Sequence, residues 1–315
     1  MLMGLSDEDW TEALREKRRF VETRCRVLRL IRAFFESEGF LEVQTPLLTS
    51  APAPEVHIRP VPAGSGLFLS TSPELHMKRL LAAGFEKIFQ VTCAFREGEC
   101  GRLHHPEFTI LEWYRLGANY KDLQQDCENL VRFTCRQIGP GPGFNFRGVG
   151  LDFEADWERW SVREAFKTFA GWEPGPNPDE DRFDLDMAQK VEPNLGFPSP
   201  CILEDYPKSR AALARIKPED PEVAERFELY WAGIELANGF SELTDPDEQR
   251  VRFQSAIAAK RQTEGIAYPL PDAFLSSLKH LGPCAGIAFG VDRFVMLLTD
   301  ADSIDDVVAF SPEME

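Results

Sequence analysis

The sequence predicts an α+β fold in which helices flank a mainly antiparallel β-sheet. Strand-like and helix-like segments are grouped along the chain and do not strictly alternate. Two long strand candidates, 87–96 and 107–116, are joined by about ten residues, which is typical of an antiparallel hairpin. We expect residues 1–315 to form one domain, with a less regular connecting or inserted segment at about 140–220.

The composition is that of an ordinary globular protein, with 43% hydrophobic and 28% charged residues. No apolar run is long enough to cross a membrane, and MLMGLSDEDW does not resemble a signal peptide, so the cytoplasm is expected. The seven cysteines are odd in number and include no CxxC pair. This argues against a zinc site or a disulfide framework and favours reduced, packed cysteines.

The net charge is −17. Proteins that bind nucleic acids usually present a basic surface, because neutralising phosphates supplies most of the affinity. The acidic balance therefore argues against a nucleic-acid partner. It leaves room for a small anionic ligand, since a few arginines in a pocket suffice to bind one.

The N-terminal part predicts two helices. Apolar residues recur at helical spacing over 17–38, and Gly39 is a plausible stop. The segment FLEVQTPLL follows and is expected to be extended. Ser72 as cap and Pro73 at the first helical position predict a second helix that runs to about Gly84.

A further amphipathic helix is expected over 120–139, after the predicted hairpin. The glycine- and proline-rich stretches 139–150 and 172–182 are typical of loops. Within the less regular segment we expect one short helix near Val162–Phe169.

The C-terminal part predicts strands, then helices. Segment 225–243 is strand-rich, with Gly233 and the Asn-Gly pair at 238–239 as expected interruptions. The Asp-Pro pair at 245–246 predicts a helix start. GIAFGVDRFVMLL predicts a strand, a glycine turn and a buried helix.

Two groups of residues indicate a binding site. In the strand 107–116, alternation places Phe108, Ile110, Glu112 and Tyr114 on one face, which is either half pocket or half exposed.

Glu228, Glu235 and Glu242 lie seven residues apart, and a bulge could bring them to one face. Clustered carboxylates bind Mg²⁺ or an ammonium group, although exposed strand glutamates would give the same pattern.

Five ordered motifs resemble a known family. FLEVQTPLL, FREGECGRLHHPEFTILEWY and GIAFGVDRFVMLL are similar to motifs 1, 2 and 3 of class II aminoacyl-tRNA synthetases, and TSPELHMKRLL and GIELANGFSEL to their lysyl branch. The resemblance spans about residues 18–312 and implies the class II catalytic fold. The short segment before motif 1 leaves no room for an anticodon-binding barrel. This resembles the elongation factor P–(R)-β-lysine ligase family, which charges a lysine side chain of elongation factor P through an ATP-derived adenylate.

The resemblance implies roles at ATP and Mg²⁺. Arg96 and Arg293 would be catalytic: Arg96 at the α-phosphate and attacking carboxylate, and Arg293 at the γ-phosphate and one adenine face. Phe108 would stack on the other adenine face. The implied ATP-binding positions are Arg96, Glu97, Gly98, Glu99, His104, His105, Phe108, Glu235, Leu236, Gly290 and Arg293. Glu228 and Glu235 match the positions linked to Mg²⁺.

The amino-acid substrate would carry two ammonium groups, which carboxylates bind. Glu242, with Tyr114 beside it, matches the position that receives the side-chain ammonium, and Glu74 and Glu112 are candidates for the other amino group. The implied substrate-binding positions are Ser72, Pro73, Glu74, Glu112, Tyr114, Asn238, Phe240, Glu242 and Ala288.

Three residues depart from the lysyl pattern. Gly98 stands where a glutamate usually contacts adenine, so Glu97, Glu99 or backbone groups could replace that contact. His105 stands where an asparagine is usual. Ala288 replaces a glycine, and its methyl group is expected to disfavour α-lysine while leaving room for the shifted amino group of β-lysine.

Three alternative functions stay open: a lysyl-tRNA synthetase core that acts on tRNA, a non-catalytic regulatory paralog, and a ligase for a small amine. The charge argues against the first, and the retained arginines and glutamates argue against the second. The expected partners are elongation factor P and lysine or (R)-β-lysine, with neither tRNA nor a membrane. In this family motif 1, which ends at Pro46 here, forms a dimer interface, so a homodimer is expected.

Overall fold

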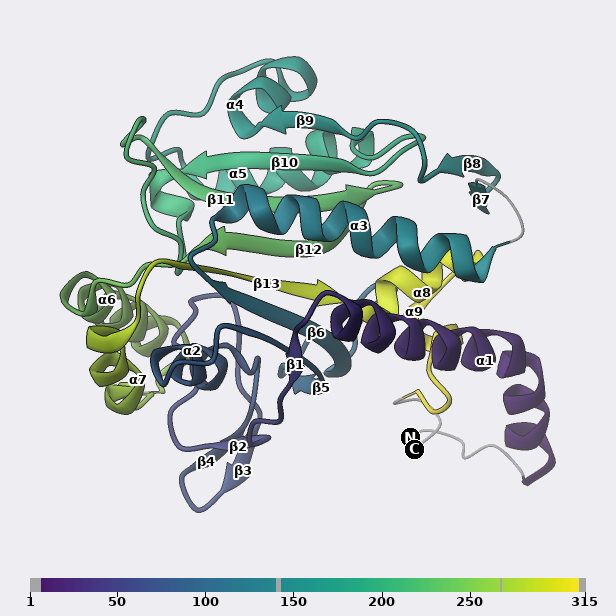
Figure 1. Cartoon of the computed structure of the whole chain (residues 1–315), viewed down its shortest axis with the longest axis horizontal. Helices are drawn as coiled ribbons and strands as arrows, with labels where there is room; N and C mark the ends of the chain where they lie inside the picture. Colours follow the sequence, from purple (N-terminus) through teal and green to yellow (C-terminus); the bar gives the residue numbers. More distant parts are fainter. Residues whose placement is uncertain (1–6, 140–142, 267, 312–315) are drawn as a thin grey trace.

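The structure, a computed structural model, describes residues 7–139, 143–266 and 268–311 (Figure 1). Its largest element is an eight-stranded sheet. In spatial order the strands are β1 (Leu41–Glu42), β5 (Lys87–Phe95), β6 (Glu107–Leu116), β13 (Cys284–Gly290), β12 (Ile234–Ser241), β11 (Val223–Trp231), β10 (Cys201–Pro207) and β9 (Glu158–Ser161). Only the two edge pairs are parallel. The predicted α+β fold with a mainly antiparallel sheet is confirmed.

The β5–β6 hairpin forms as predicted, with Lys87 opposite Arg115 and Phe95 opposite Glu107. Its side chains alternate between a core face and a second face that carries polar groups. Leu111 and Trp113 are fully buried in the main core, whereas Glu112 lies on the second face.

The β11–β12 hairpin turns at Ala232 and Gly233, both with positive φ (+53° and +72°). Such a two-residue turn matches the twist of paired strands. The predicted interruption at 238–239 is wrong, because both residues pair within β12. Gly239 instead permits close packing: a Cβ there would lie 2.8 Å from the Phe227 ring.

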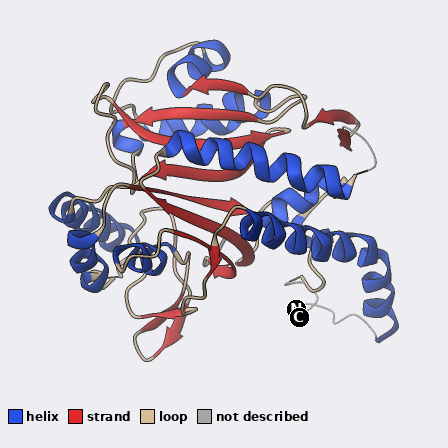
Figure 2. Ribbon diagram, viewed as in Figure 1, coloured by secondary structure: helices blue, strands red, loops and turns tan. Residues whose placement is uncertain are grey.

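Three helices cover the core face of the sheet: α1 (Asp7–Ser37), α3 (Tyr120–Ile138) and α8 (Val291–Thr299) (Figure 2). The helix predicted over 17–38 begins ten residues earlier, at Asp7. α3 begins with a reciprocal capping box between Asn119 and Asp122. These helices and the inner strands bury one continuous apolar cluster, which fixes the sheet as a rigid base.

The second face is covered at its two ends. At one end, α2 (Glu74–Ala82), α6 (Pro246–Glu264) and α7 (Asp272–Ser277) share an apolar cluster with β6. At the other end, α4 (Val162–Ala165) and α5 (Glu180–Asp186) pack on β10 and β11 (Figure 1). The part of the second face between these groups carries the cavity described below.

The segment 140–220 is more regular than predicted. The expected short helix is present as α4 and the π-helical turn that follows it. The loop predicted at 139–150 contains a hairpin, β7 (Gly143–Phe146) with β8 (Val149–Asp152); residues 140–142 of that loop lie outside the described residues. The loop predicted at 172–182 ends earlier, because α5 starts at Glu180.

The remaining elements are short. β2 (Leu48–Thr49), β4 (Leu67–Leu69) and β3 (Pro62–Gly64) form a small sheet, and α9 is Ile304–Val307. Across the described ranges, no helix combines the length and the apolar character needed to cross a membrane. All seven cysteines are free.

Gly239→Ala is expected to lower the free energy of unfolding by about 1–3 kcal/mol, because the added methyl group must displace buried groups. Its Cβ would lie 2.8 Å from Phe227 and 3.0 Å from the Cβ of Ile287. Urea or thermal unfolding measures the effect. Gly175→Ala is the control, since its Cβ would meet nothing within 4 Å. Equal stability of the two variants would contradict the packing argument.

Candidate active site

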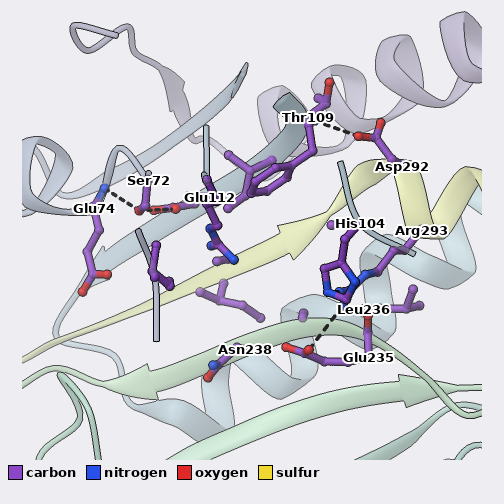
Figure 3. Close-up of a pocket in the computed structure, with 18 of the residues that line it drawn as sticks. Ser72, Glu74, His104, Thr109, Glu112, Glu235, Leu236, Asn238, Asp292 and Arg293 are labelled. Atoms are coloured by element: carbon purple, nitrogen blue, oxygen red, sulfur yellow. Dashed lines mark hydrogen bonds and ion pairs between the residues drawn. The ribbon is translucent and has the colours of Figure 1, made fainter. Parts of the chain in front are cut away.

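A cavity opens on the second face of the sheet, over β6, β12 and β13 (Figure 3). Its walls come from the first turn of α2, the loop after Phe95, the segment around Glu55 and the start of α8. Of the site residues predicted from the sequence, all line this cavity except Pro73, Glu97, Gly98, Glu228 and Glu242.

Arg293 at the start of α8 is held in place at one end of the cavity. Its Nη1 donates to the Glu235 carbonyl oxygen (2.9 Å) and carboxylate (3.2 Å), and its Nη2 lies 2.6 Å from His104 Nε2 (Figure 3). Burial and the Arg293 charge lower the pKa of His104. His104 is therefore neutral near pH 7 and can accept a hydrogen bond from Arg293.

Arg96 is the second arginine of the cavity. Its guanidinium lies over the Phe108 ring, 4.9 Å from the centroid, and 3.7 Å from Glu99. Its Nε is buried and has no hydrogen-bond partner among the described residues. A buried donor without a partner is costly, so an anionic oxygen in the cavity would satisfy it. These contacts suit a phosphate or carboxylate group.

The loop after Phe95 separates its glutamates. Gly98 adopts φ +79°, a turn conformation that favours glycine. Glu97 is directed to Arg59 (3.1 Å), whereas Glu99 lines the cavity beside Arg96. Of the two glutamates considered as replacements for the usual adenine contact, only Glu99 is positioned at the cavity.

A bulge in β12 brings Glu235 to the cavity face. Leu229 pairs with Ala237 and Tyr230 with Glu235, so Leu236 is the extra residue. The shift places Glu235 on the side of Asn238, where Glu228 of β11 also lies as the cross-strand neighbour of Asn238. Gly233 turns the chain between Glu228 and Glu235 as expected, whereas the bulge is at Leu236 and not at the Asn-Gly pair 238–239.

Glu228 is buried behind the cavity wall, where both of its carboxylate oxygens accept hydrogen bonds. It accepts hydrogen bonds from Tyr206 and Tyr230 (2.6 Å) and from Arg226 (2.6 Å). Burial and the Glu235 charge raise the pKa of Glu228. Among the described residues, no group of three or more His, Cys, Asp or Glu side chains is arranged to hold a metal ion. Mg²⁺ often uses only one or two carboxylates together with phosphate oxygens, and Glu235 fits that mode.

The opposite end of the cavity is rich in carboxylates. Glu112 accepts hydrogen bonds from Ser72 Oγ (2.6 Å) and Tyr114 OH (2.7 Å), and Ser72 Oγ also accepts from the Glu74 backbone (Figure 3). Burial and the Glu74 charge raise the pKa of Glu112 to about 8. An ammonium group placed here would favour the ionised carboxylate.

Glu242 lies just past the end of β12 and is fully buried against Lys78. Lys78 also pairs with Glu74 one helical turn before it, and its ammonium lies 5.2 Å from the centroid of the Phe240 ring. Burial alone would lower the pKa of Lys78, but the two carboxylates raise it, so Lys78 is charged. Burial raises the pKa of Glu242 despite Lys78.

Glu242 is accessible from the cavity because Gly286 has no side chain. A Cβ at this position would lie 2.1 Å from the Tyr114 ring and 2.5 Å from Glu242 Oε1. Gly286 lines the cavity, so Glu242 Oε1 lies directly beneath its wall. That oxygen has no hydrogen-bond partner within the described part of the chain. It can therefore accept a hydrogen bond from a group in the cavity.

Three features of the site were not predicted from the sequence. Glu55 lines the cavity from a proline-rich segment that shows no periodicity. Lys78 is the internal partner of Glu242, and its spacing of four residues from Glu74 was a readable signal for a helical ion pair. His105 is bound to Asp305 of α9 (2.7 Å), a contact between residues 200 apart that no local pattern could indicate.

The cavity therefore combines two chemistries. Arg96 and Arg293 provide cationic donors at one end, and Glu74, Glu112 and Glu242 provide carboxylates at the other. Such a site can hold a polyphosphate and a substrate that bears both a carboxylate and ammonium groups.

Comparisons with known proteins agree with this chemistry. The family model of class II tRNA synthetases (D, K and N) matches residues 10–314. The elongation factor P--(R)-beta-lysine ligase of Vibrio cholerae serotype O1 is 40% identical over 308 residues, which are 92% of this chain and 94% of that protein. The ligases of the same name from Sodalis glossinidius and Pectobacterium carotovorum are 40% and 39% identical, with the same coverage. The chain belongs to the class II tRNA synthetase family, among the elongation factor P--(R)-beta-lysine ligases.

Proposed function

We propose that this protein uses ATP to activate (R)-β-lysine, or lysine, as an aminoacyl-adenylate and transfers the aminoacyl group to a lysine side chain of elongation factor P. The observation that carries the proposal is the division of the cavity. Two arginines face one end, and buried carboxylates surround the other. The likeness to ligases of this name over 92% of the chain supports the same assignment.

In the first step, a carboxylate oxygen of the substrate attacks the α-phosphorus of ATP, the bond to the β-phosphate breaks and pyrophosphate leaves. Arg96 would neutralise the α-phosphate and orient the attacking carboxylate, because its buried Nε lacks a partner among the described residues. Arg293, fixed by Glu235 and His104, would bind the terminal phosphate. Stacking of adenine on Phe108 stays a prediction, since Arg96 covers that ring.

Mg²⁺ would be held by Glu235 together with ATP phosphate oxygens, with Glu228 behind it. When bound, the ion neutralises phosphate charge. The chain's own contribution is to hold Glu235 on the cavity face through the bulge at Leu236.

In the second step, the amine of the acceptor lysine attacks the carbonyl carbon of the adenylate. An amide bond forms, the carbonyl-to-phosphate bond breaks and AMP leaves with the electron pair. Glu242, reached past Gly286, would hold the substrate's side-chain ammonium during both steps, with Glu74 and Glu112 near the other amino group. This fixes the carboxyl carbon beside Arg96.

The assembly and location are also part of the proposal. Motif 1 carries three exposed leucines, Leu41, Leu47 and Leu48. Exposed apolar side chains of this kind are consistent with an interface, and we propose a homodimer through motif 1. We further propose that residues 1–315 act as one catalytic unit in the cytoplasm and do not use tRNA.

ATP–pyrophosphate exchange tests the first step, and mass analysis of elongation factor P tests the second. We expect exchange with (R)-β-lysine and a mass increase of one aminoacyl group on elongation factor P. Arg96→Ala should reduce exchange by about 100- to 1,000-fold, because it removes preorganised charge stabilisation. Arg136→Ala is the matched control, since this arginine is exposed and pairs with Glu154 on the surface, away from the cavity.

Strong exchange followed by transfer to tRNA, with none to elongation factor P, would support the tRNA-synthetase alternative instead. Absence of exchange with any lysine isomer would support a non-catalytic role.

The KM for lysine should depend on pH. The pKa of Glu112 is raised to about 8, so this carboxyl is largely protonated at pH 7 before the substrate binds. An ammonium ligand favours the ionised form, so binding releases a proton and KM falls as pH rises from 6 towards 8. For one linked proton the fall is up to about tenfold per pH unit. Glu112→Gln should make this profile shallower, while Glu55 and Glu242, whose pKa values are raised to about 7 and about 8, keep part of the dependence. A wild-type KM independent of pH would contradict the linkage.

Ala288→Gly should shift the preference between lysine isomers towards α-lysine. Ala288 pairs with Asn238 and Glu112 across the sheet and lines the cavity, so its methyl group borders the amino-acid end. One methyl group in a pocket is worth about 10- to 200-fold in selectivity. The ratio of kcat/KM for the two isomers measures it. Ala285→Gly, on the same strand but facing the core, controls for strand flexibility. An unchanged ratio in Ala288→Gly refutes this role.

A further inference from the structure

A fourth carboxylate belongs to the amino-acid end of the cavity. Glu55 comes from the segment that joins β2 to β3 of the small sheet, outside every motif used above, and lines the cavity with Ser72, Glu74 and Arg96. It follows two buried residues, Ala53 and Pro54, that anchor the chain at this point. Glu55 is half-buried, whereas the next two residues are exposed.

Two independent contacts hold the Glu55 segment in place. The buried ammonium of Lys260 on α6 donates to the backbone carbonyl of Glu55 (2.9 Å) and to that of Ile58. Four residues after Glu55, Arg59 pairs with Glu97 (3.1 Å), and the Arg59 carbonyl accepts a hydrogen bond from the Glu97 backbone (2.7 Å). The segment is therefore a fixed wall that joins α6 to the loop carrying Arg96.

Glu55 lines the cavity together with residues of both its ends: Glu74 of the amino-acid end and Arg96 of the phosphate-binding end. The charges of Glu74, Arg96, Arg226 and Lys260 all act on the Glu55 carboxyl. A group bound between Glu74 and Arg96 would therefore lie within reach of the Glu55 charge.

We propose that Glu55 binds the ammonium group nearest the substrate's carboxylate and so selects substrates that carry a second amine. The inference rests on the proposed function. A substrate held by Glu242 at its far ammonium and by Arg96 at its carboxylate presents its second ammonium between them, beside Glu55 and Glu74. Glu55 supplies counter-charge there in addition to Glu74, whose Oε1 is paired with Lys78.

The electrostatics of the free site agree with this role. Burial and the Glu74 charge raise the pKa of Glu55 to about 7. The positive charges of Arg96, Arg226 and Lys260 lower this pKa but do not cancel the rise. A carboxylate that is held partly protonated by its surroundings gains most from an arriving cation. Ionising Glu55 in this site costs free energy, and only a substrate with a second ammonium group compensates that cost.

The test compares Glu55→Gln with wild type on three compounds. ATP–pyrophosphate exchange gives kcat/KM for (R)-β-lysine and α-lysine, and competition gives the inhibition constant of 6-aminohexanoic acid, which lacks the second amine. Glu55→Gln should lower kcat/KM for the better lysine isomer by about 10- to 100-fold, the effect of losing a charged hydrogen bond. Inhibition by 6-aminohexanoic acid should be unchanged or stronger.

Each other outcome overturns the proposal. Equal losses for the lysines and for 6-aminohexanoic acid would mean a general role in shaping the cavity, and no loss for either would mean no role. His57→Gln, exposed on the same segment, is the control for disturbance of the wall. An unchanged thermal midpoint shows that Glu55→Gln is folded. Wild-type protein without exchange on any lysine would refute the proposed function itself, which is a separate result.

Discussion

A fully buried ammonium group, Lys78, lies between Glu74 and Glu242 and sets the charge balance of the amino-acid end. An unpaired charge in this position would be very costly, so the lysine and the two carboxylates require one another. The Lys78–Glu242 pair also ties α2 to the end of β12, because Lys78 belongs to α2 and Glu242 directly follows β12. The position of residues 72–74, the turn that leads into α2 over the sheet, depends on this contact.

The net charge of the amino-acid end of the cavity is negative even when Lys78 is included. Glu55, Glu74, Glu112 and Glu242 stand against one lysine, and burial raises the pKa of three of these carboxyl groups. A cavity in this state favours cations of matching number and position. It disfavours acidic or singly charged amino acids, which would leave buried carboxylates uncompensated. Selectivity thus follows from charges built into rigid elements, before any contact with a partner protein.

Local sequence pattern was enough to predict the elements that carry the site. Alternation assigned Glu112 and Tyr114 to one face of β6, amphipathic spacing predicted α3, and the glycine turn after β13 predicted the start of α8. What could not be predicted depends on contacts between distant segments. The bulge at Leu236 replaces the expected interruption at 238–239, and Glu55 reaches the cavity only because Lys260 on α6 fixes its backbone. Neither the bulge nor the Lys260 hydrogen bond produces a periodic pattern in the sequence from which it could be predicted.

The departures at Gly98 and His105 have a common physical reason. The loop after Phe95 is held from outside on both sides: Glu97 pairs with Arg59, and His105 pairs with Asp305. Gly98 supplies the positive φ that turns Glu97 outward while Arg96 and Glu99 stay at the cavity. Gly98 and His105 therefore help to position the loop that carries Arg96. A loop fixed in this way presents Arg96 already oriented, so less ordering entropy opposes nucleotide binding.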